Sequence, residues 1–271
     1  MTDCSGAPLI HRMPYGFGPG PGPRQGPDGQ PFNGSGKPYI KAFAVRFESE
    51  EKALAALLPP GFKLDGEPVV TIDVQYLTDV EWLAGRGYSS VGIKFPARRD
   101  DVRGSFFLVG FQNSADAITF GREELGYPML YANIEEPVET DQGTDINISW
   151  DGTRFLTLRF LRDFAPGVPP SGGEAGNEGT LLYKYMPRTG RWGEADIAKA
   201  TLTPPGLGNT EILSIETGTG QAVFTPGNWE QLPTLHHIVE TLAGLPVKAW
   251  RTATTAEAKG GRDLRDQIEL A

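Results

Sequence analysis

The chain of 271 residues is 39% hydrophobic and 22% charged, which is the composition of an ordinary globular protein. Its formal net charge of −9 argues against nucleic acid and anionic membrane surfaces as partners, because like charges repel. No apolar run approaches the ~20 residues that a membrane-spanning helix needs. Residues 1–16 lack the basic start and apolar core of a secretory signal, so we expect a cytoplasmic protein.

Glycine and proline are concentrated near the N-terminus, where residues 16–36 read GFGPGPGPRQGPDGQPFNGSG. Proline lacks the backbone donor that helices and sheets need, and glycine is costly to order. This composition predicts a flexible or wrapping arm over residues 1–37. A phosphate-binding loop is not indicated, because the required strand before it and helix after it are missing. The rest of the chain divides into a main domain, residues 38–254, and a C-terminal tail, residues 255–271.

The main domain begins with strands that are separated by one short helix. Residues 39–47 alternate between apolar and other side chains, which predicts a half-buried strand. Ser49 is expected to cap a helix with the sequence EEKALAALL, which ends at two prolines. Residues 68–77, PVVTIDVQYL, give the clearest strand, with Asp73 on its polar face. Residues 104–111 predict a fully apolar strand.

The second half of the main domain is predicted to be nearly all strand. Short strands are expected at residues 145–150, 154–160, 180–186, 195–203 and 211–216. A long loop is expected at 165–179, a helix at 232–242 and a last strand at 248–252, and the tail is expected to form a loose helix. Many strands with few helices indicate a β-rich α+β fold, either a barrel or a strongly curved sheet.

A set of short motifs occurs in a fixed order between residues 39 and 252. They are LPPGF at 58–62, EPVV at 67–70, GY at 87–88, GREELGYP at 121–128, LYKYMP at 182–187 and LPV at 245–247. Each motif alone is weak, but together and in this order they resemble the acetoacetate decarboxylase family. The resemblance implies a curved antiparallel β-barrel or cone with peripheral helices. It also implies a pocket inside the cone and assembly into a homo-oligomer.

The resemblance further implies chemistry that depends on an amine. In the family, a lysine directly after the YP motif forms a Schiff base with a β-keto acid, and an apolar cavity and a second lysine lower its pKa. In this chain Met129 and Leu130 follow the YP of residues 127–128, and neither can form an imine. The acid expected two positions after Tyr88 is Ser90.

The remaining polar groups that the resemblance implies are kept only in part. The family's arginine near the first strand falls at Ile40 or Lys41, whereas the acid of the second strand is kept as Asp73. The loss of several coupled groups favours a subfamily with different chemistry, or with none. We therefore expect enol(ate) acid/base chemistry on a small β-keto acid or β-dicarbonyl compound without a Schiff base, of lyase, hydrolase or cyclase type.

Five residues are candidates for polar roles at the site. Asp73 is the candidate acid or base, and a salt-bridged or solvent-facing carboxylate is the alternative. Tyr88 and Ser90 either hydrogen-bond a carbonyl or enolate oxygen or belong to a turn. Arg122 and Glu123 either face the cavity, where the arginine binds a substrate carboxylate, or form an ion pair that fixes the turn before YP.

Other residues bear on the cavity or on cofactors. Met129 and Leu130 are expected to line an apolar cavity. Lys94 is a candidate for returning an amine to the pocket, against the commoner alternative of an exposed lysine, and Lys184 is interpreted as structural. The three histidines and the single cysteine lack metal-ligand spacing, so neither a metal nor another cofactor is expected. Two other hypotheses remain: a non-catalytic small-molecule-binding protein, and a decarboxylase that uses a relocated lysine.

Overall fold

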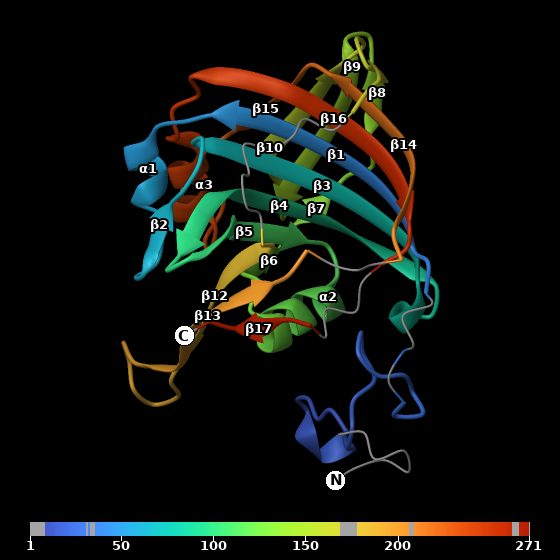
Figure 1. Cartoon of the computed structure of the whole chain (residues 1–271), viewed down its shortest axis with the longest axis vertical. Coiled ribbons are helices and arrows are strands. Elements are labelled where there is room, and N and C mark those ends of the chain that lie inside the picture. The colour runs from blue at the N-terminus through green and yellow to red at the C-terminus, as the bar shows by residue number, and fades with distance from the viewer. Residues whose placement is uncertain are drawn as a thin grey trace.

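The computed structural model describes residues 9–30, 32, 36–168, 178–205, 209–261 and 266–270, and every structural statement below concerns those residues. They form two sheets with a few short helices (Figure 1). The helical elements are η1 (Tyr15–Phe17), α1 (Glu51–Ala55), η2 (Glu81–Leu83), α2 (Ala115–Phe120), the π-helical turn η3 (Gly121–Leu125) and α3 (His236–Ala243). The strand-rich α+β fold predicted from the sequence is confirmed.

The larger sheet is built around five long strands. They are β1 (Tyr39–Glu48), β3 (Val69–Val80), β4 (Arg86–Arg99), β5 (Val102–Gln112) and β16 (Ala249–Lys259). The shorter strands are β2 (Phe62–Leu64), β6 (Met129–Tyr131), β11 (Ala165–Pro166), β12 (Thr180–Pro187), β13 (Ala195–Thr203), β14 (Glu211–Gly218) and β17 (Ile268–Glu269).

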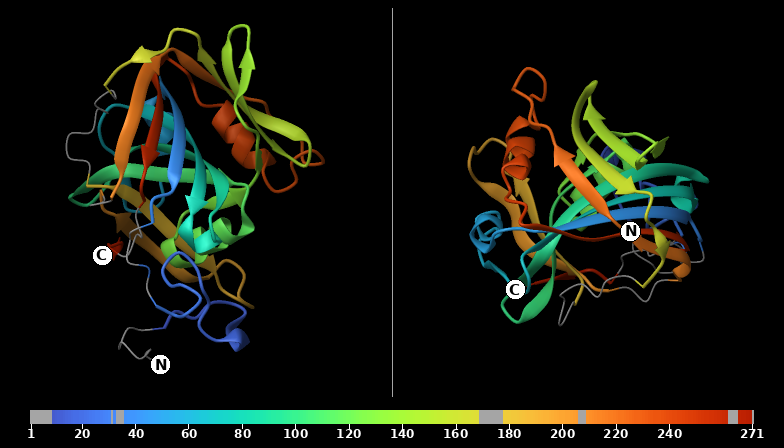
Figure 2. Two further views of the ribbon diagram at one scale, coloured as in Figure 1. Left: turned by 90° about the vertical axis from the view of Figure 1, so that its right-hand side faces the viewer. Right: turned by 90° about the horizontal axis from the view of Figure 1, so that it is seen from above.

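The strand order of the larger sheet is β11-β14-β16-β1-β3-β4-β5-β12-β13-β17, with β2 beside β4 and β6 beside β5. Its pairings are antiparallel except that β5 runs parallel to β12 and to β6. The described order ends at an edge strand on each side, so the sheet is strongly curved rather than closed into a barrel (Figures 1 and 2).

The smaller sheet lies across one face of the larger one (Figure 2). It has the order β15 (Gly220–Phe224), β10 (Thr153–Leu161), β9 (Gly143–Trp150) and β7 (Asn133–Ile134), with β8 (Val138–Thr140) also paired to β9. One hydrophobic cluster contains residues of both sheets, including Phe43 and Ile72 from the larger and Ile146 and Leu156 from the smaller. The main core therefore fills the space between the two sheets.

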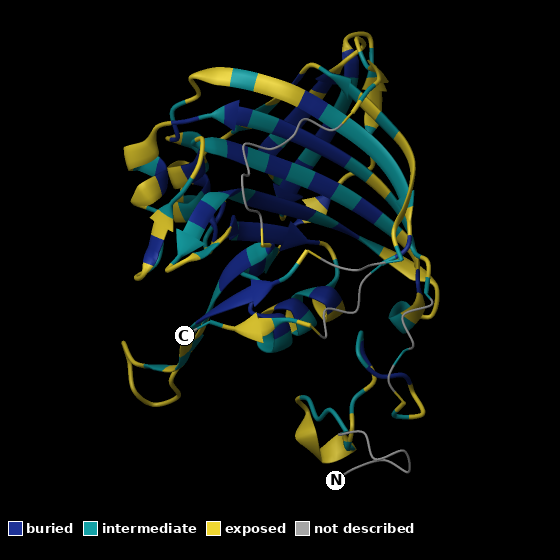
Figure 3. Cartoon of the chain, viewed as in Figure 1, coloured by how far each residue is buried: buried dark blue, intermediate teal, exposed yellow. Residues whose placement is uncertain are grey.

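Strand β3 shows how the larger sheet presents two different faces. Val70, Ile72 and Val74 are buried in the core between the sheets, whereas Asp73 and Gln75 are half-buried on the opposite face. Successive side chains of a strand point to opposite faces, so one alternating sequence supplies both the apolar face and the polar face. The striped burial of the long strands is visible in Figure 3. The face that carries Asp73 is available for a functional site.

The predicted strands are confirmed, with shifted ends, but two local expectations are wrong. Ser49 does not cap α1: the cap position is Glu50, and the backbone of Ser49 instead donates to the Pro68 carbonyl at 2.8 Å. The loose helix expected in the tail is wrong for residues 255–259, which extend β16 between β1 and β14. Strand β4, which carries several candidate residues, was not predicted.

The other expected elements are met in part. The late helix is shorter than expected, because α3 begins only at His236. Most of the loop expected at 165–179 lies outside the described residues. Among the described residues, no helix combines the length and apolar character that a membrane span requires.

The described part of the N-terminal arm lies beside η3. Arg12 forms an ion pair with Glu124, and Arg24 lies 3.9 Å from the same carboxylate. Gln25 is buried, and its amide donates to two carbonyls of the arm itself at 2.8 Å each. These contacts give the arm a compact form and anchor it to the segment that carries the GREELGYP motif.

Candidate functional site

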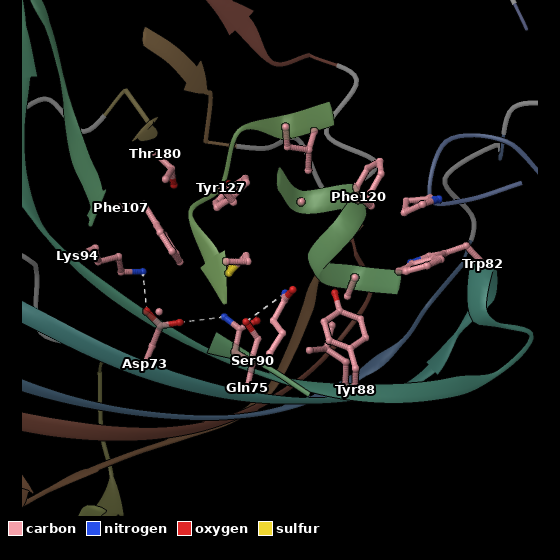
Figure 4. Close-up of a pocket in the computed structure, with 18 residues that line it drawn as sticks. Asp73, Gln75, Trp82, Tyr88, Ser90, Lys94, Phe107, Phe120, Tyr127 and Thr180 are labelled. Carbon is pink, nitrogen blue, oxygen red and sulfur yellow. Dashed lines mark hydrogen bonds and ion pairs between the residues drawn. The ribbon is translucent and has the colours of Figure 1, made fainter. Parts of the chain in front are cut away.

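A cavity of about 330 Å³ lies on the face of the larger sheet that is turned away from the main core. Its floor comes from β3 and β4, where Asp73 and Gln75 stand beside Ser90 and Lys94 (Figure 4). The register pairs Gln75 with Ser90 and Asp73 with Gly92, so the polar side chains of the two strands form one continuous row.

The central feature of the floor is an ion pair. Lys94 Nζ lies 3.2 Å from Asp73 Oδ1, and the two side chains are 34% and 18% exposed. The amide of Gln75 donates to the other carboxylate oxygen of Asp73 at 3.4 Å. The cavity thus contains an acidic and a cationic group in contact, and among the described residues the second carboxylate oxygen accepts one long hydrogen bond.

A second polar contact lies at the neighbouring strand. Gln112 of β5 is 7% exposed, and its Nε2 donates to Ser90 Oγ at 3.4 Å. Its Oε1 is buried and accepts no hydrogen bond from the described residues. A buried polar atom without a partner is costly, so this position favours a ligand that supplies a donor.

Two glycines make room above the floor. Gly92 of β4 and Gly110 of β5 are paired in register. A Cβ at Gly92 would lie 2.9 Å from the ring of Phe107, and one at Gly110 would collide with the sulfur of Met129. The missing side chains therefore let Phe107 and Met129 pack close to these two strands, beside the polar row.

The opposite wall comes from α2, η3 and the chain that follows them. Ser114 caps α2 by accepting a hydrogen bond from the backbone of Ala117 at 3.3 Å. The rings of Tyr127 and Phe107 meet edge to face, with centroids 5.1 Å apart. Phe120 and Leu125 complete the apolar part of this wall. The motif GREELGYP therefore shapes the cavity mainly by placing apolar side chains.

The wall is braced from behind by Lys184 of β12. Its Nζ donates to the carbonyls of Glu123 and Glu124, at the C-terminal end of η3. Burial lowers the pKa of Lys184, and the nearby charge of Lys199 lowers it further. The amine points at the backbone of η3, and Lys184 does not belong to the wall of this cavity.

Aromatic side chains line the other end of the cavity. Tyr88 of β4 and Trp82 of η2 have ring centroids 6.4 Å apart, and Trp82 also lies 6.3 Å from Phe120. Burial raises the pKa of the Tyr88 phenol, so the group stays neutral and able to donate a hydrogen bond. Pro23 of the arm closes this end.

Five of the eight residues singled out in the sequence line this one cavity: Asp73, Tyr88, Ser90, Lys94 and Met129. The other three lie outside its wall. Arg122 instead donates to the carbonyl of Met129 at 3.0 Å, and the backbone of Glu123 accepts from Lys184. Leu130 packs against the main core, because neighbours in a strand point to opposite faces.

The cavity also contains residues that the sequence reasoning missed. They are chiefly Gln75, Trp82, Phe107, Gln112 and Phe120. The first had a readable signal, because it follows Asp73 by two residues on the polar face of a predicted strand. The others are brought in by strand register, by η2 and by α2. The described residues contain no group of three or more histidine, cysteine or acidic side chains placed to hold a metal ion.

Comparisons with known proteins identify relatives at the level of family and fold. Residues 12–259 match the family model described as acetoacetate decarboxylase (ADC). An acetoacetate decarboxylase from Legionella pneumophila has a similar structure, with a TM-score of 0.67 and 17% identity over 89% of this chain and 91% of that one. Among proteins with curated functions, none matches the sequence.

Two further similar structures have other descriptions. The enduracididine biosynthesis enzyme MppR, solved with pyruvate, has a TM-score of 0.63 and 14% identity over 87% of this chain and 90% of its own. An acetoacetate decarboxylase-like enzyme from Sphingomonas wittichii RW1 has a TM-score of 0.62 and 15% identity, covering 86% and 92%. At these identities the likeness shows a shared fold.

Proposed function

The chain belongs to the acetoacetate decarboxylase family, and from that premise we propose that it is an enzyme that transfers a proton at the carbon beside a carbonyl group. The substrate is a small β-keto acid or β-dicarbonyl compound, and the reaction passes through an enol(ate). The observation that carries the proposal is the contact between Asp73 and Lys94 on the floor of the cavity.

The two charged groups have complementary roles in this reaction. The carboxylate of Asp73 accepts the proton as the C–H bond breaks, and the electron pair of that bond moves onto the carbonyl oxygen. The ammonium group of Lys94 donates to the oxygen on which negative charge develops. Return of the proton to a different carbon completes an isomerisation, and departure of hydroxide from the β-carbon of the enolate, with a proton to form water, completes a dehydration.

The surrounding residues support this proton transfer. Ser90 and Gln112 lie on the same floor and orient the second oxygen of a dicarbonyl substrate, while the neutral phenol of Tyr88 supplies a further donor. Phe107 and Met129 pack beside the polar row, and exclusion of water strengthens electrostatic interactions inside the site.

A decarboxylase that uses Lys94 as a relocated imine-forming amine is the second candidate. The position of Lys94 in the cavity wall favours it, because an amine does reach the pocket although Met129 and Leu130 follow the YP motif. Only the neutral amine attacks a carbonyl, however, and the amine of Lys94 lies in an ion pair with Asp73, at 3.2 Å. The geometry therefore ranks imine chemistry below enolate chemistry.

The first test measures proton exchange. Deuterium incorporation from D₂O into acetoacetate and a panel of β-keto acids and β-diketones is followed by NMR, and the protein-dependent rate is compared between variants. Asp73→Asn removes the base, so we expect that rate to fall by about 10²–10⁴-fold. Asp145→Asn is the matched control, because Asp145 is ion-paired to Arg159 across two strands of the smaller sheet. Equal losses in both variants contradict the proposal.

The second test separates the two candidate mechanisms. Borohydride is added in the presence of acetoacetate, and the mass of the intact protein is measured. We expect the mass to stay unchanged. A trapped adduct on Lys94 instead supports the imine mechanism. Ligands that bind without exchange or turnover favour a non-catalytic binding protein.

A further inference from the structure

A second cavity, of about 320 Å³, adjoins the polar one. The two cavities have four wall residues in common: Pro23, Leu77, Trp82 and Tyr88. The rings of Trp82 and Tyr88 are tilted by 58° to each other, with their centroids 6.4 Å apart. The two spaces are therefore adjacent, and these four residues form a wall that both cavities share.

The second cavity differs from the first in its chemistry. Its own wall is mostly apolar, with Phe32 and Pro38 from the arm and the start of the main domain, Ile40 from β1 and Val80 from β3. Glu81 is the one charged residue in its described wall. By contrast, the first cavity contains Asp73, Lys94 and several amide and hydroxyl groups. A ligand that spans both must be polar at one end and apolar at the other.

The polar end of such a ligand is fixed by the floor of the first cavity. The reacting carbonyl belongs beside Asp73 and Lys94, because these groups form the ion pair. The buried Oε1 of Gln112, which accepts no hydrogen bond from the described residues, fits an enol hydroxyl. From this anchor, the direction toward Tyr88 and Trp82 leads to the apolar cavity.

We propose that the substrate is an elongated β-dicarbonyl compound or β-keto acid, with an aromatic or branched alkyl substituent of about phenyl size held in the second cavity. The proposal rests on the proposed function for the placement of the reacting carbonyl. Its size argument is independent, since a cavity of roughly 150 Å³ already holds benzene. The flat faces of Trp82 and Tyr88 at the entrance suit an aromatic ring.

The experiment compares two stable diketones that differ only beyond the reacting group. Acetylacetone carries a methyl group where benzoylacetone carries a phenyl ring, and calorimetric titration gives the dissociation constant of each. We expect benzoylacetone to bind at least ~10-fold more tightly, because the phenyl ring buries several more apolar carbons. Equal affinities overturn the proposal.

Variants on the arm show whether the preference comes from this cavity. Phe32→Ala removes apolar wall from the second cavity, so the affinity for benzoylacetone should fall by about fivefold or more while that for acetylacetone stays the same. Phe17→Ala is the matched control, because Phe17 lies on the same arm with 88% of its surface exposed. Ile40→Trp fills the cavity from β1 and should abolish the preference.

The outcomes separate this inference from the proposed function. The proposal of an elongated substrate is overturned if the protein exchanges protons but does not prefer benzoylacetone. It is also overturned if Phe32→Ala weakens the binding of both ligands equally. A preference that Phe32→Ala removes supports the second cavity even if no ligand is ever exchanged or converted. In that last case the proposed enzymatic function is contradicted, while the proposal of an elongated ligand that occupies both cavities is retained.

Discussion

The larger and the smaller sheet each carry a cross-strand ion pair of an aspartate with a basic residue. The pair of Asp73 and Lys94 joins β3 to β4, and that of Asp145 and Arg159 joins β9 to β10. The two carboxylates are almost equally exposed, at 18% and 17%. Exposure of the acid therefore does not distinguish a pair in a cavity from a pair that stabilises a sheet.

The geometry of the cation does distinguish them. Arg159 donates two hydrogen bonds of 2.9 Å, one to each oxygen of Asp145, and this contact raises the pKa of Arg159. Lys94 Nζ lies 3.2 Å from Asp73 Oδ1, a longer contact than either of these. Arg159 lies directly opposite Asp145 in the register, whereas the residue opposite Asp73 on β4 is Gly92, which has no side chain to pair with the carboxylate. A carboxylate in a cavity wall with spare hydrogen-bonding capacity is suited to proton transfer.

Of the two cations, the one in the cavity is expected to have the larger effect on exchange when it is removed. Lys94→Met removes the donor to the developing oxyanion, so the protein-dependent exchange rate should fall by about 10²–10³-fold. Arg159→Met removes the matched cation of the smaller sheet and should leave that rate unchanged. NMR exchange measurements on both variants check this. A similar loss in both would mean that the cavity pair acts only through the fold.

Strand β3 and the polar face that carries Asp73 could be predicted from the sequence, whereas strand β4 could not. The alternation of β3 is unbroken, so the pattern of residues by itself assigns Asp73 to a polar face. Strand β4 contains Gly87, Gly92 and Pro96, which are unfavourable in strands, and these residues hide its alternation. Tertiary pairing with strands on both sides outweighs their low propensity.

The position of Lys94 shows why the rest of the site could not be predicted. The sequence alone favours an exposed lysine. Only the register, with Thr71 opposite Lys94 and Asp73 opposite Gly92, puts its amine diagonally across from a carboxylate. Phe107 likewise reaches the cavity because a bulge shifts β5 against β4 between Ile93 and Lys94. Such long-range pairings leave no signal in a single sequence.

An intermediate effect is expected when a methyl group is added at Gly92, opposite Asp73. A Cβ at Gly92 would lie 2.9 Å from the ring of Phe107 and 3.2 Å from Asp73 Oδ1. Gly92→Ala should therefore lower the free energy of unfolding by about 1–3 kcal/mol, as overpacking does. Urea unfolding measures the change. Gly16→Ala is the control, because a Cβ there meets nothing within 4 Å. If the stability of Gly92→Ala is unchanged, the side chains around Gly92 can move to accommodate an added methyl group, and the expected overpacking does not occur.

The smallest effect is expected at a third ion pair. It resembles the pair of Asp145 and Arg159, in which the arginine donates to both carboxylate oxygens. Arg103 donates to both oxygens of Asp65, with Nη2 to Oδ1 at 2.8 Å, and this hydrogen bonding lowers the pKa of Asp65. The folded-state pKa lies below the unfolded value of about 3.9, so the pair stabilises the fold above that pH and its contribution is lost as pH falls through the folded pKa.

Asp65→Asn should therefore cause a small loss of stability at pH 7, and the two proteins should converge as the pH falls. Urea unfolding from pH 7 to the lowest pH at which the wild type remains folded measures both curves. Asp101→Asn, at an exposed turn residue between β4 and β5, is the control. Because Arg103 and Asp65 lie away from the cavity wall, the exchange rate should not change. A loss of exchange in Asp65→Asn would mean that a two-hydrogen-bond ion pair outside the cavity also supports the site. The distinction drawn between such pairs and the pair of Asp73 and Lys94 would then no longer hold.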